Sequence, residues 1–377
     1  MRVPLIKPDL PDISAVQQEF AEILNNGRIT NFGRYVAEFE ARTGEYLGVP
    51  TVTVSSGTMG LLFTLCALGL RPRDKVILPS FTFMATAQAV CFAGGIPVFA
   101  EVDEDLNISV SDLAELLARH NDIAAVMPVH MYGLPARTRA LEEVVAAAAK
   151  RRGREIPVLY DAAHAFGAAD GAMRVGGFGD AEVFSLSVTK VLVTVEGGLV
   201  ASRRTDIIER IRSMRNYGIC GSYNAQMPGM NGKMSEFHAI VGLRNLVGFE
   251  DRMALRQERA SEYRTLIESE TAFRLVAWPA DVRPTFKDFT VRVPHGWNEE
   301  HRAVAMARLA EAGVETRAYF FPPVHEQGRF RAFSDRPLPR TEALSRQVIT
   351  LPFYTTINHA EMEHVVDALR RIEREIA

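Results

Sequence analysis

Cysteine is scarce in this chain, and the few cysteines are scattered. Cys66, Cys91 and Cys220 are the only three in 377 residues, and no CxxC pair occurs. Apolar residues flank Cys66 and Cys91, so we expect both to be small buried hydrophobic side chains. We therefore expect neither a disulfide framework nor a metal site.

Long hydrophobic runs and blocks of one charge are missing as well. No uninterrupted apolar stretch is long enough to span a bilayer, and the first 13 residues contain three prolines and no signal-peptide core. The net charge is −3, with acidic and basic residues interspersed, whereas binding to nucleic acid or anionic membranes favours basic patches. We expect a cytoplasmic protein with small-molecule substrates, and neither nucleic acid nor membrane as a partner.

Short apolar runs alternate with amphipathic stretches between residues 52 and 201. The strand-like runs lie at residues 75–83, 96–102, 123–133, 156–165 and 181–190. Helical patterns at 111–119 and 136–152 have apolar residues at three- and four-residue spacing. This alternation predicts an α/β fold with a mainly parallel sheet flanked by helices. Ligands of such sheets bind beyond the carboxyl ends of the strands.

A smaller α+β unit is predicted toward the carboxyl end, since 377 residues exceed a typical single core. Residues 234–270 form one long helical pattern without proline, which could connect two domains. Beyond it, residues 274–293 are strand-rich, and the patterns at 298–312, 340–348 and 359–376 are helical. We expect a large domain over residues 1–250 and a small domain over residues 251–377.

The segment VTVSSGTMGLL, which begins at Val52, could bind a phosphate group. A strand ends at residues 55–57, and Thr58 opens an apolar helix whose free N–H groups and dipole favour an anion. Gly57 would let a ligand approach the backbone closely. An ordinary helix N-cap is the alternative, because Ser and Thr cap helices routinely.

Two further strand ends carry ionisable side chains. Asp161, in VLYDAAHAFG, could pair with a cationic heterocycle and hold its nitrogen protonated; a solvated or capping carboxylate is the alternative. Lys190, in FSLSVTKVLVTVEGG, has apolar flanks that would lower its pKa and favour the free amine of a Schiff base. The alternative for Lys190 is a surface side chain whose stem covers apolar residues. Ser185 could add a hydroxyl group to the phosphate site.

The order of these elements fits one cofactor, pyridoxal 5'-phosphate (PLP). Its phosphate, its pyridine nitrogen and its aldehyde would meet the turn, the aspartate and the lysine in that order. Proteins pair the Schiff-base lysine of PLP with a partner such as Asp at the pyridine nitrogen.

At this point the sequence resembles the DegT/StrS-type nucleotide-sugar aminotransferases, a family of fold-type I PLP-dependent enzymes. The resemblance covers nearly the whole chain and includes further segments in the same order: GRITNFGRYVAEFE, LPSFTFMATAQAV, VHMYG, RNYGI, GMNGKMSEFHAIVGLRNL, FFPPVHEQ and ITLPFY. It implies transfer of an amino group from an amino acid, L-glutamate, to a nucleotide-linked keto sugar. The ITNFG and SFTF segments are most similar to members that act on dTDP-4-keto-6-deoxyhexoses.

The resemblance also implies roles for individual residues around PLP. Lys190 matches the Schiff-base lysine and Asp161 the partner of the pyridine nitrogen, while Gly57, Thr58 and Ser185 match phosphate contacts. Phe83 matches an aromatic residue that stacks on the ring, with core packing as the alternative. His164 stands where family members carry Gln or His near the ring hydroxyl.

Three more positions concern the neighbouring subunit and the substrate. Asn231 matches an asparagine that reaches the phosphate of the neighbouring subunit, which implies a homodimer with shared active sites. His325 matches a substrate-side histidine, although a hydrogen-bonded structural histidine is the alternative. Lys233 stands on the substrate side where many members have Arg. Val191 stands where Asn is frequent in the family, and Ser187 stands where an aromatic residue or His is common. Because these positions and Lys233 lie near the substrate, the resemblance does not identify the substrate.

Two other functions remain possible. A PLP-dependent sugar dehydratase on the same scaffold would carry histidine in place of Lys190. A regulatory or binding protein could keep the fold without turnover, but Lys190, Asp161, Ser185 and Asn231 are all retained.

Overall fold

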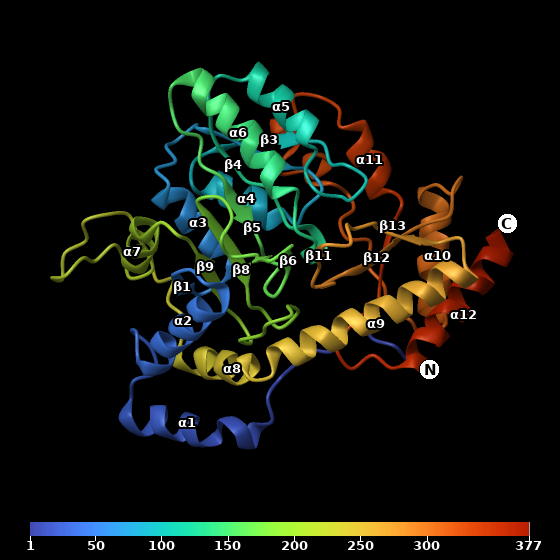
Figure 1. Cartoon of the computed structure of the whole chain (residues 1–377), viewed down its shortest axis with the longest axis horizontal. Coiled ribbons are helices and arrows are strands. Elements are labelled where there is room, and N and C mark those ends of the chain that lie inside the picture. The colour runs from blue at the N-terminus through green and yellow to red at the C-terminus, as the bar shows by residue number, and fades with distance from the viewer. Residues whose placement is uncertain (377) are drawn as a thin grey trace.

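A seven-stranded sheet lies at the centre of the molecule (Figure 1). The structure is a computed structural model and describes residues 1–376. The sheet consists of a three-stranded part and a four-stranded part. Parallel bridges between Val126 and Val158 and between Val129 and Asp161 join these two parts. In spatial order the strands are β3 (Ile96–Ala100), β2 (Lys75–Pro79), β4 (Ile123–Val126), β5 (Leu159–Asp161), β8 (Ala181–Ser185), β9 (Gly198–Ala201) and β1 (Thr51–Val54). Within this sheet only β9 runs opposite to the other six strands, so the predicted mainly parallel sheet is confirmed.

Helices cover both faces of the sheet because successive strand residues point to opposite sides. In β8, Val183 belongs to the core beneath α3 (Gly57–Ala67), α4 (Met84–Phe92) and α7 (Thr205–Met214), whereas Phe184 packs on the opposite face. That opposite face is covered by α2 (Arg34–Leu47), α5 (Val110–Arg119), α6 (Thr138–Arg152) and α8 (Glu236–Leu246), and α1 (Ile13–Asn26) lies against α8. Helices α5 and α6 confirm the two patterns predicted between the strands.

A second core forms around a small antiparallel sheet at the other end of the molecule (Figure 1). Its strands are β10 (Arg274–Leu275), β12 (Phe289–Arg292) and β13 (Val348–Leu351), and its helices are α9 (Phe249–Glu270), α10 (Glu299–Glu311) and α12 (His359–Ile376). Between the two cores, β11 (Val282–Arg283) pairs with β6 (Ala169–Asp170), which pairs with β7 (Met173–Arg174).

In the carboxyl-terminal region, one predicted long helix is wrong, and one confirmed helix ends three residues earlier than predicted. The helix expected over residues 234–270 is divided into α8 and α9, because Gly248 adopts a left-handed φ of 65° that ends a helix. The helix expected over residues 340–348 is α11 (Pro339–Ser345), and Val348 already begins β13.

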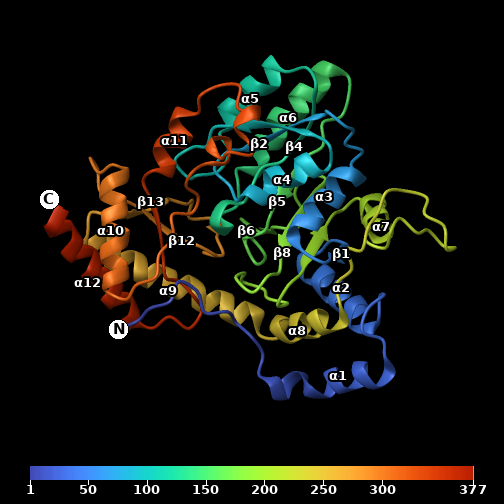
Figure 2. The same ribbon diagram turned by 180° about the vertical axis from the view of Figure 1, so that it is seen from behind.

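Some residues pack across the boundary expected near residue 250. Val3 forms a bridge with Val314 and is fully buried in the second core. From there the first residues run along α9 and α8 to α1, as Figures 1 and 2 show from opposite sides. Conversely, Val324, Phe330 and Leu338 belong to the first core. The division into residues 1–250 and 251–377 stays a prediction. Each part contributes a few residues to the core of the other.

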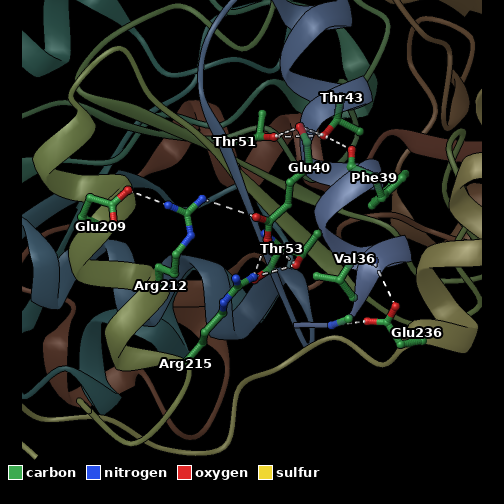
Figure 3. A network of polar contacts seen from close by, with 11 residues as sticks. Val36, Phe39, Glu40, Thr43, Thr51, Thr53, Glu209, Arg212, Arg215 and Glu236 are labelled. Carbon is green, nitrogen blue, oxygen red and sulfur yellow. Dashed lines mark hydrogen bonds and ion pairs between the residues drawn. The ribbon is translucent and has the colours of Figure 1, made fainter. Parts of the chain in front are cut away.

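A buried arginine anchors the loop of residues 216–233, which follows α7 (Figure 3). The Nη1 atom of Arg215 donates hydrogen bonds to the carbonyl oxygen and hydroxyl group of Thr53 in β1, at 2.6 and 2.7 Å, and to the carboxylate of Glu40 in α2. At the other end of the loop, Gly232 accepts from the amide of Ser55 at 2.7 Å. Both ends of the loop are therefore held at the end of β1.

Within residues 1–376, no helix combines the length and the apolar character that a membrane span requires.

Candidate active site

A cavity of about 360 Å³ lies at the carboxyl ends of β1, β5 and β8, as expected for a sheet of this kind. Seven of the predicted site residues line it: Gly57, Thr58, Phe83, Asp161, His164, Ser185 and Lys190. Side chains from the second unit close one wall, where Lys287, Asp288, Tyr319 and Phe320 contribute to the lining. Residues from both parts of the chain therefore line the cavity.

The turn between β1 and α3 forms one end of the cavity. Ser56 caps α3, and its Oγ accepts a hydrogen bond from the amide of Met59 at 3.2 Å. The capping alternative is thus confirmed for Ser56, but it leaves the first-turn amides of Gly57 and Thr58 without an intrahelical acceptor. A Cβ atom on Gly57 would lie 2.9 Å from Cβ of Ser185, so the turn and Ser185 are in direct contact. This cradle fits a phosphate group.

Asp161 ends β5 and is only 5% exposed. Its Oδ2 accepts a hydrogen bond from the hydroxyl group of Thr86 at 2.8 Å, and its Oδ1 accepts from the amide of Ala163 at 3.1 Å. Burial raises the pKa of Asp161, while these hydrogen bonds and the nearby Lys190 act in the opposite direction. A cation at this place would stabilise the ionised carboxylate, so the site fits a protonated pyridine nitrogen better than the alternative of a solvated carboxylate.

Lys190 lies in the loop after β8 and lines the cavity. Its Nζ has no hydrogen-bond partner among residues 1–376. Burial lowers the pKa of Lys190 to about 7, and the ammonium group of Lys287 is the second cause of this shift. A large fraction of the side chain is then an uncharged amine near neutral pH, which is the form that attacks an aldehyde. This environment argues against the alternative of a surface lysine.

Phe83 and His164 lie on the cavity wall near Phe320. The Phe83 side chain is 51% exposed, so core packing does not explain it, and its ring centroid is 6.1 Å from that of Phe320. The His164 ring is stacked at 6.3 Å on the same Phe320 ring. Burial lowers the pKa of His164 well below its usual value, with Lys190 and Lys287 acting in the same direction, so the imidazole is neutral.

Three predicted residues lie outside this cavity. Asn231 is exposed and forms a bridge with Asn216 across the loop of residues 216–233. Lys233 is half-buried and donates a hydrogen bond to Asn216 Oδ1 at 3.4 Å. The roles of Asn231 at a neighbouring subunit and of Lys233 at the substrate stay predictions.

His325 is buried at a separate place, between the end of β2 and α11. Its Nδ1 is 2.6 Å from Oγ of Ser80, and its Nε2 is 3.4 Å from the carboxylate of Glu342. Since both ring nitrogens have partners, this geometry favours the structural alternative over a substrate contact. The substrate-binding role of His325 remains a prediction.

Thr86, Lys287, Asp288, Tyr319 and Phe320 are among the site residues that were not predicted from the sequence. Thr86 lies within the quoted SFTFMAT segment, but only the structure shows that its hydroxyl group reaches Asp161. The pair Lys287–Asp288 interrupts the apolar run of TFKDFTV, and two adjacent charges in such a run are a sequence signal of a functional site.

Comparison with known proteins agrees with this geometry. The model of the DegT/DnrJ/EryC1/StrS aminotransferase family matches residues 12–370. A dTDP-3-amino-3,4,6-trideoxy-alpha-D-glucose transaminase from Streptomyces venezuelae is 31% identical, over 98% of this chain and 96% of its own. A GDP-perosamine synthase from Caulobacter vibrioides is 27% identical, over 98% and 99% of the two chains. Among solved structures, DesI in the presence of its TDP-sugar product superposes with a TM-score of 0.90 at 32% identity, covering 100% of this chain and 94% of that chain.

Proposed function

The chain belongs to the DegT/DnrJ/EryC1/StrS aminotransferase family and is a PLP-dependent aminotransferase, and on this premise we propose that it transfers an amino group from L-glutamate to a nucleotide-linked keto sugar. The observation that carries the proposal is a single cavity in which Lys190, with a pKa of about 7, lies with the buried Asp161 and an anion-binding turn. The acceptor that we propose is a dTDP-4-keto-6-deoxyhexose. The similarity to DesI, solved with a TDP-sugar, supports the nucleotide.

The residues of the cavity divide the work as follows. The amides of Gly57 and Thr58 and the hydroxyl group of Ser185 would hold the phosphate, and Asp161 would hold the proton on the ring nitrogen. PLP supplies an electron sink for the charge that develops when a proton leaves the donor's Cα. Lys190 would hold PLP through its amine and, once the donor has displaced that amine, would move a proton between the donor's Cα and the cofactor's aldehyde carbon. A pKa of about 7 suits both directions of this transfer.

Two rival functions predict different behaviour. A dehydratase of this scaffold would lack the lysine, so the presence of Lys190 opposes it. A non-catalytic binding protein would not respond to an amino donor. A lysine-bound PLP gives a yellow protein, and L-glutamate should bleach it under our proposal.

The acceptor is tested with a panel of nucleotide keto sugars and L-glutamate as donor. We expect kcat/KM for a dTDP-4-keto-6-deoxyhexose to exceed that for its GDP-linked counterpart and for a 3-keto isomer by at least about tenfold, because each would misplace a polar group in the site. The assay follows 2-oxoglutarate release. A higher kcat/KM for the GDP-linked or 3-keto sugar would overturn the acceptor assignment, and no 2-oxoglutarate with any sugar would overturn the proposed transamination.

We further propose a homodimer in which Asn231 of one chain completes the phosphate site of the other. Two observations support it: Asn231 is exposed and outside the cavity of its own chain, and the loop that carries it is anchored at both ends beside β1. A symmetric pair is also the commonest assembly of soluble chains.

Complementation between two inactive variants tests this sharing. Lys190→Ala and Asn231→Ala chains, each impaired alone, are mixed in equal amounts and allowed to exchange subunits. Half of the dimers are then mixed, and each mixed dimer has one site without a lesion, so activity should recover to about a quarter of the wild-type value. If Asn231 serves its own chain, every site keeps one lesion and mixing restores nothing. A nearly active Asn231→Ala parent would reject the phosphate role outright.

A further inference from the structure

Lys287, Asp288 and His164 form a buried chain of polar groups in the cavity wall. The Nζ atom of Lys287 donates a hydrogen bond to Oδ1 of Asp288 at 2.6 Å, and the two residues are 6% and 5% exposed. The other carboxylate oxygen, Oδ2, lies 3.7 Å from Nδ1 of His164. Within the described residues, Oδ2 and Nδ1 are both buried and have no hydrogen-bond partner.

The backbone holds these two unpaired atoms beside each other. The hydroxyl group of Thr285 donates to the carbonyl oxygen of His164 at 2.6 Å, and the amide of Lys287 donates to the carbonyl oxygen of Tyr132 at 3.0 Å. The guanidinium of Arg256 donates to the carbonyl oxygens of Thr285 and Phe286 at 3.1 and 2.8 Å. A movement of less than about 1 Å between the side chains would therefore complete a hydrogen bond from His164 to Asp288.

The donor and acceptor roles in this chain follow from the charges. Lys287 donates to Asp288, and an ionised carboxylate can only accept hydrogen bonds. His164 must then carry its proton on Nδ1 in order to pair with Oδ2. Because the ring is neutral, Nε2 has a free lone pair, and because Nδ1 is closed off, Nε2 is the nitrogen through which His164 meets the cavity.

We propose that Lys287 and Asp288 are positioning residues, which fix the proton of His164 on Nδ1 and present Nε2 to the cofactor as a hydrogen-bond acceptor. The partner of Nε2 rests on the proposed PLP site: it is a hydroxyl donor, the ring hydroxyl group of PLP. An acceptor at this place favours the protonated form of that hydroxyl group over its anion. Through His164, Lys287 and Asp288 would thus affect the protonation of the ring hydroxyl group, in addition to the effect of Asp161 on the ring nitrogen.

Nitrogen NMR on the holoenzyme labelled with ¹⁵N-histidine tests the tautomer directly, with the His164 signals identified by their loss in His164→Gln. The wild-type protein should show His164 neutral and protonated on Nδ1. In Asp288→Asn the amide group would donate to Nδ1, so the proton should move to Nε2. Glu361→Gln is the matched control, because Glu361 is also a buried carboxylate with a lysine partner, Lys7 at 2.9 Å, and lies outside the cavity.

A spectroscopic titration tests the link to the cofactor. In Asp288→Asn, Nε2–H would donate to the ring oxygen and stabilise its anion, so the pH midpoint of the long-wavelength absorbance should fall by about one unit. Glu361→Gln should keep the wild-type midpoint. A switched tautomer with an unchanged midpoint would overturn the contact with the ring hydroxyl group.

Other results would overturn the positioning role itself. They are a wild-type His164 protonated on Nε2 or charged at neutral pH, or the same tautomer in wild type and Asp288→Asn. If that variant does not fold, the wild-type spectrum still decides. The tautomer is measured independently of turnover, so a failed proposed function and a failed positioning role give different results.

Discussion

Replacing Lys190 with alanine is expected to lower transamination by a factor of at least about 10⁴, because in the mechanism we propose one side chain supplies both the covalent attachment and the proton transfer. Under our proposal the turn at Gly57 and Thr58 would still hold PLP, so the variant should bind the cofactor without the yellow, lysine-linked form. The measurements are steady-state turnover, and borohydride reduction followed by peptide mapping. Lys75→Ala is the control, since Lys75 pairs with Asp122 away from the cavity. Reduction that labels another lysine would refute the assignment.

The same residue gives the reaction of the apoprotein with PLP a characteristic pH dependence. Burial and Lys287 lower the pKa of Lys190 to about 7, so the reactive uncharged amine is the minor form below this pH and the major form above it. The rate of attachment should therefore rise through pH 7 and level off above about pH 8. A midpoint near the ordinary lysine value of about 10 would show that Lys190 is not in the environment described.

Replacing Asp161 with asparagine should lower turnover by a factor on the order of 100 to 1000, because an uncharged partner cannot keep the ring nitrogen protonated. The fold and much of the cofactor binding should remain, since the amide of Ala163 can donate to the new amide oxygen and the hydroxyl group of Thr86 can accept from the new amide nitrogen. Turnover and PLP affinity are measured on the same preparation.

Asp112→Asn provides the comparison for this substitution. Asp112 is also a buried carboxylate, 8% exposed, but it accepts from the amide of Glu101 outside the cavity. Its replacement should affect stability and leave the cofactor chemistry alone. Near-wild-type turnover of Asp161→Asn would rule out the proposed role of the aspartate.

The residues that could be predicted from the sequence are those whose position depends on local order. Asp161 and Ser185 end strands, and Gly57 opens a helix, so the rule that ligands bind at strand ends brings them together without knowledge of the tertiary structure. The α/β fold follows from the same alternation of strands and helices. The roles assigned to His164 and Phe83 needed the resemblance to a family, because neither spacing nor polarity distinguishes them.

The features that could not be predicted depend on contacts between distant parts of the chain. Lys287 belongs to the second unit and reaches Lys190 only because that unit closes the cavity. The left-handed turn at Gly248 interrupts a pattern that is helical on both sides, so periodicity alone missed the break. Val348 begins a strand because it pairs with Arg292, and this partner decides against the helical pattern before it.

The buried position of Val3 has a consequence for the order in which the protein can fold during synthesis. Val3 is synthesised well before its neighbours in the second core, such as Tyr263 and Val314. At ordinary translation rates this delay is about 10 to 60 seconds. During that time the residues around Val3 have no partner, and the sheet of β1 to β9 can form without them. The segment around Val3 is thus expected to become protected from proteolysis on the ribosome only after its later partners have been made.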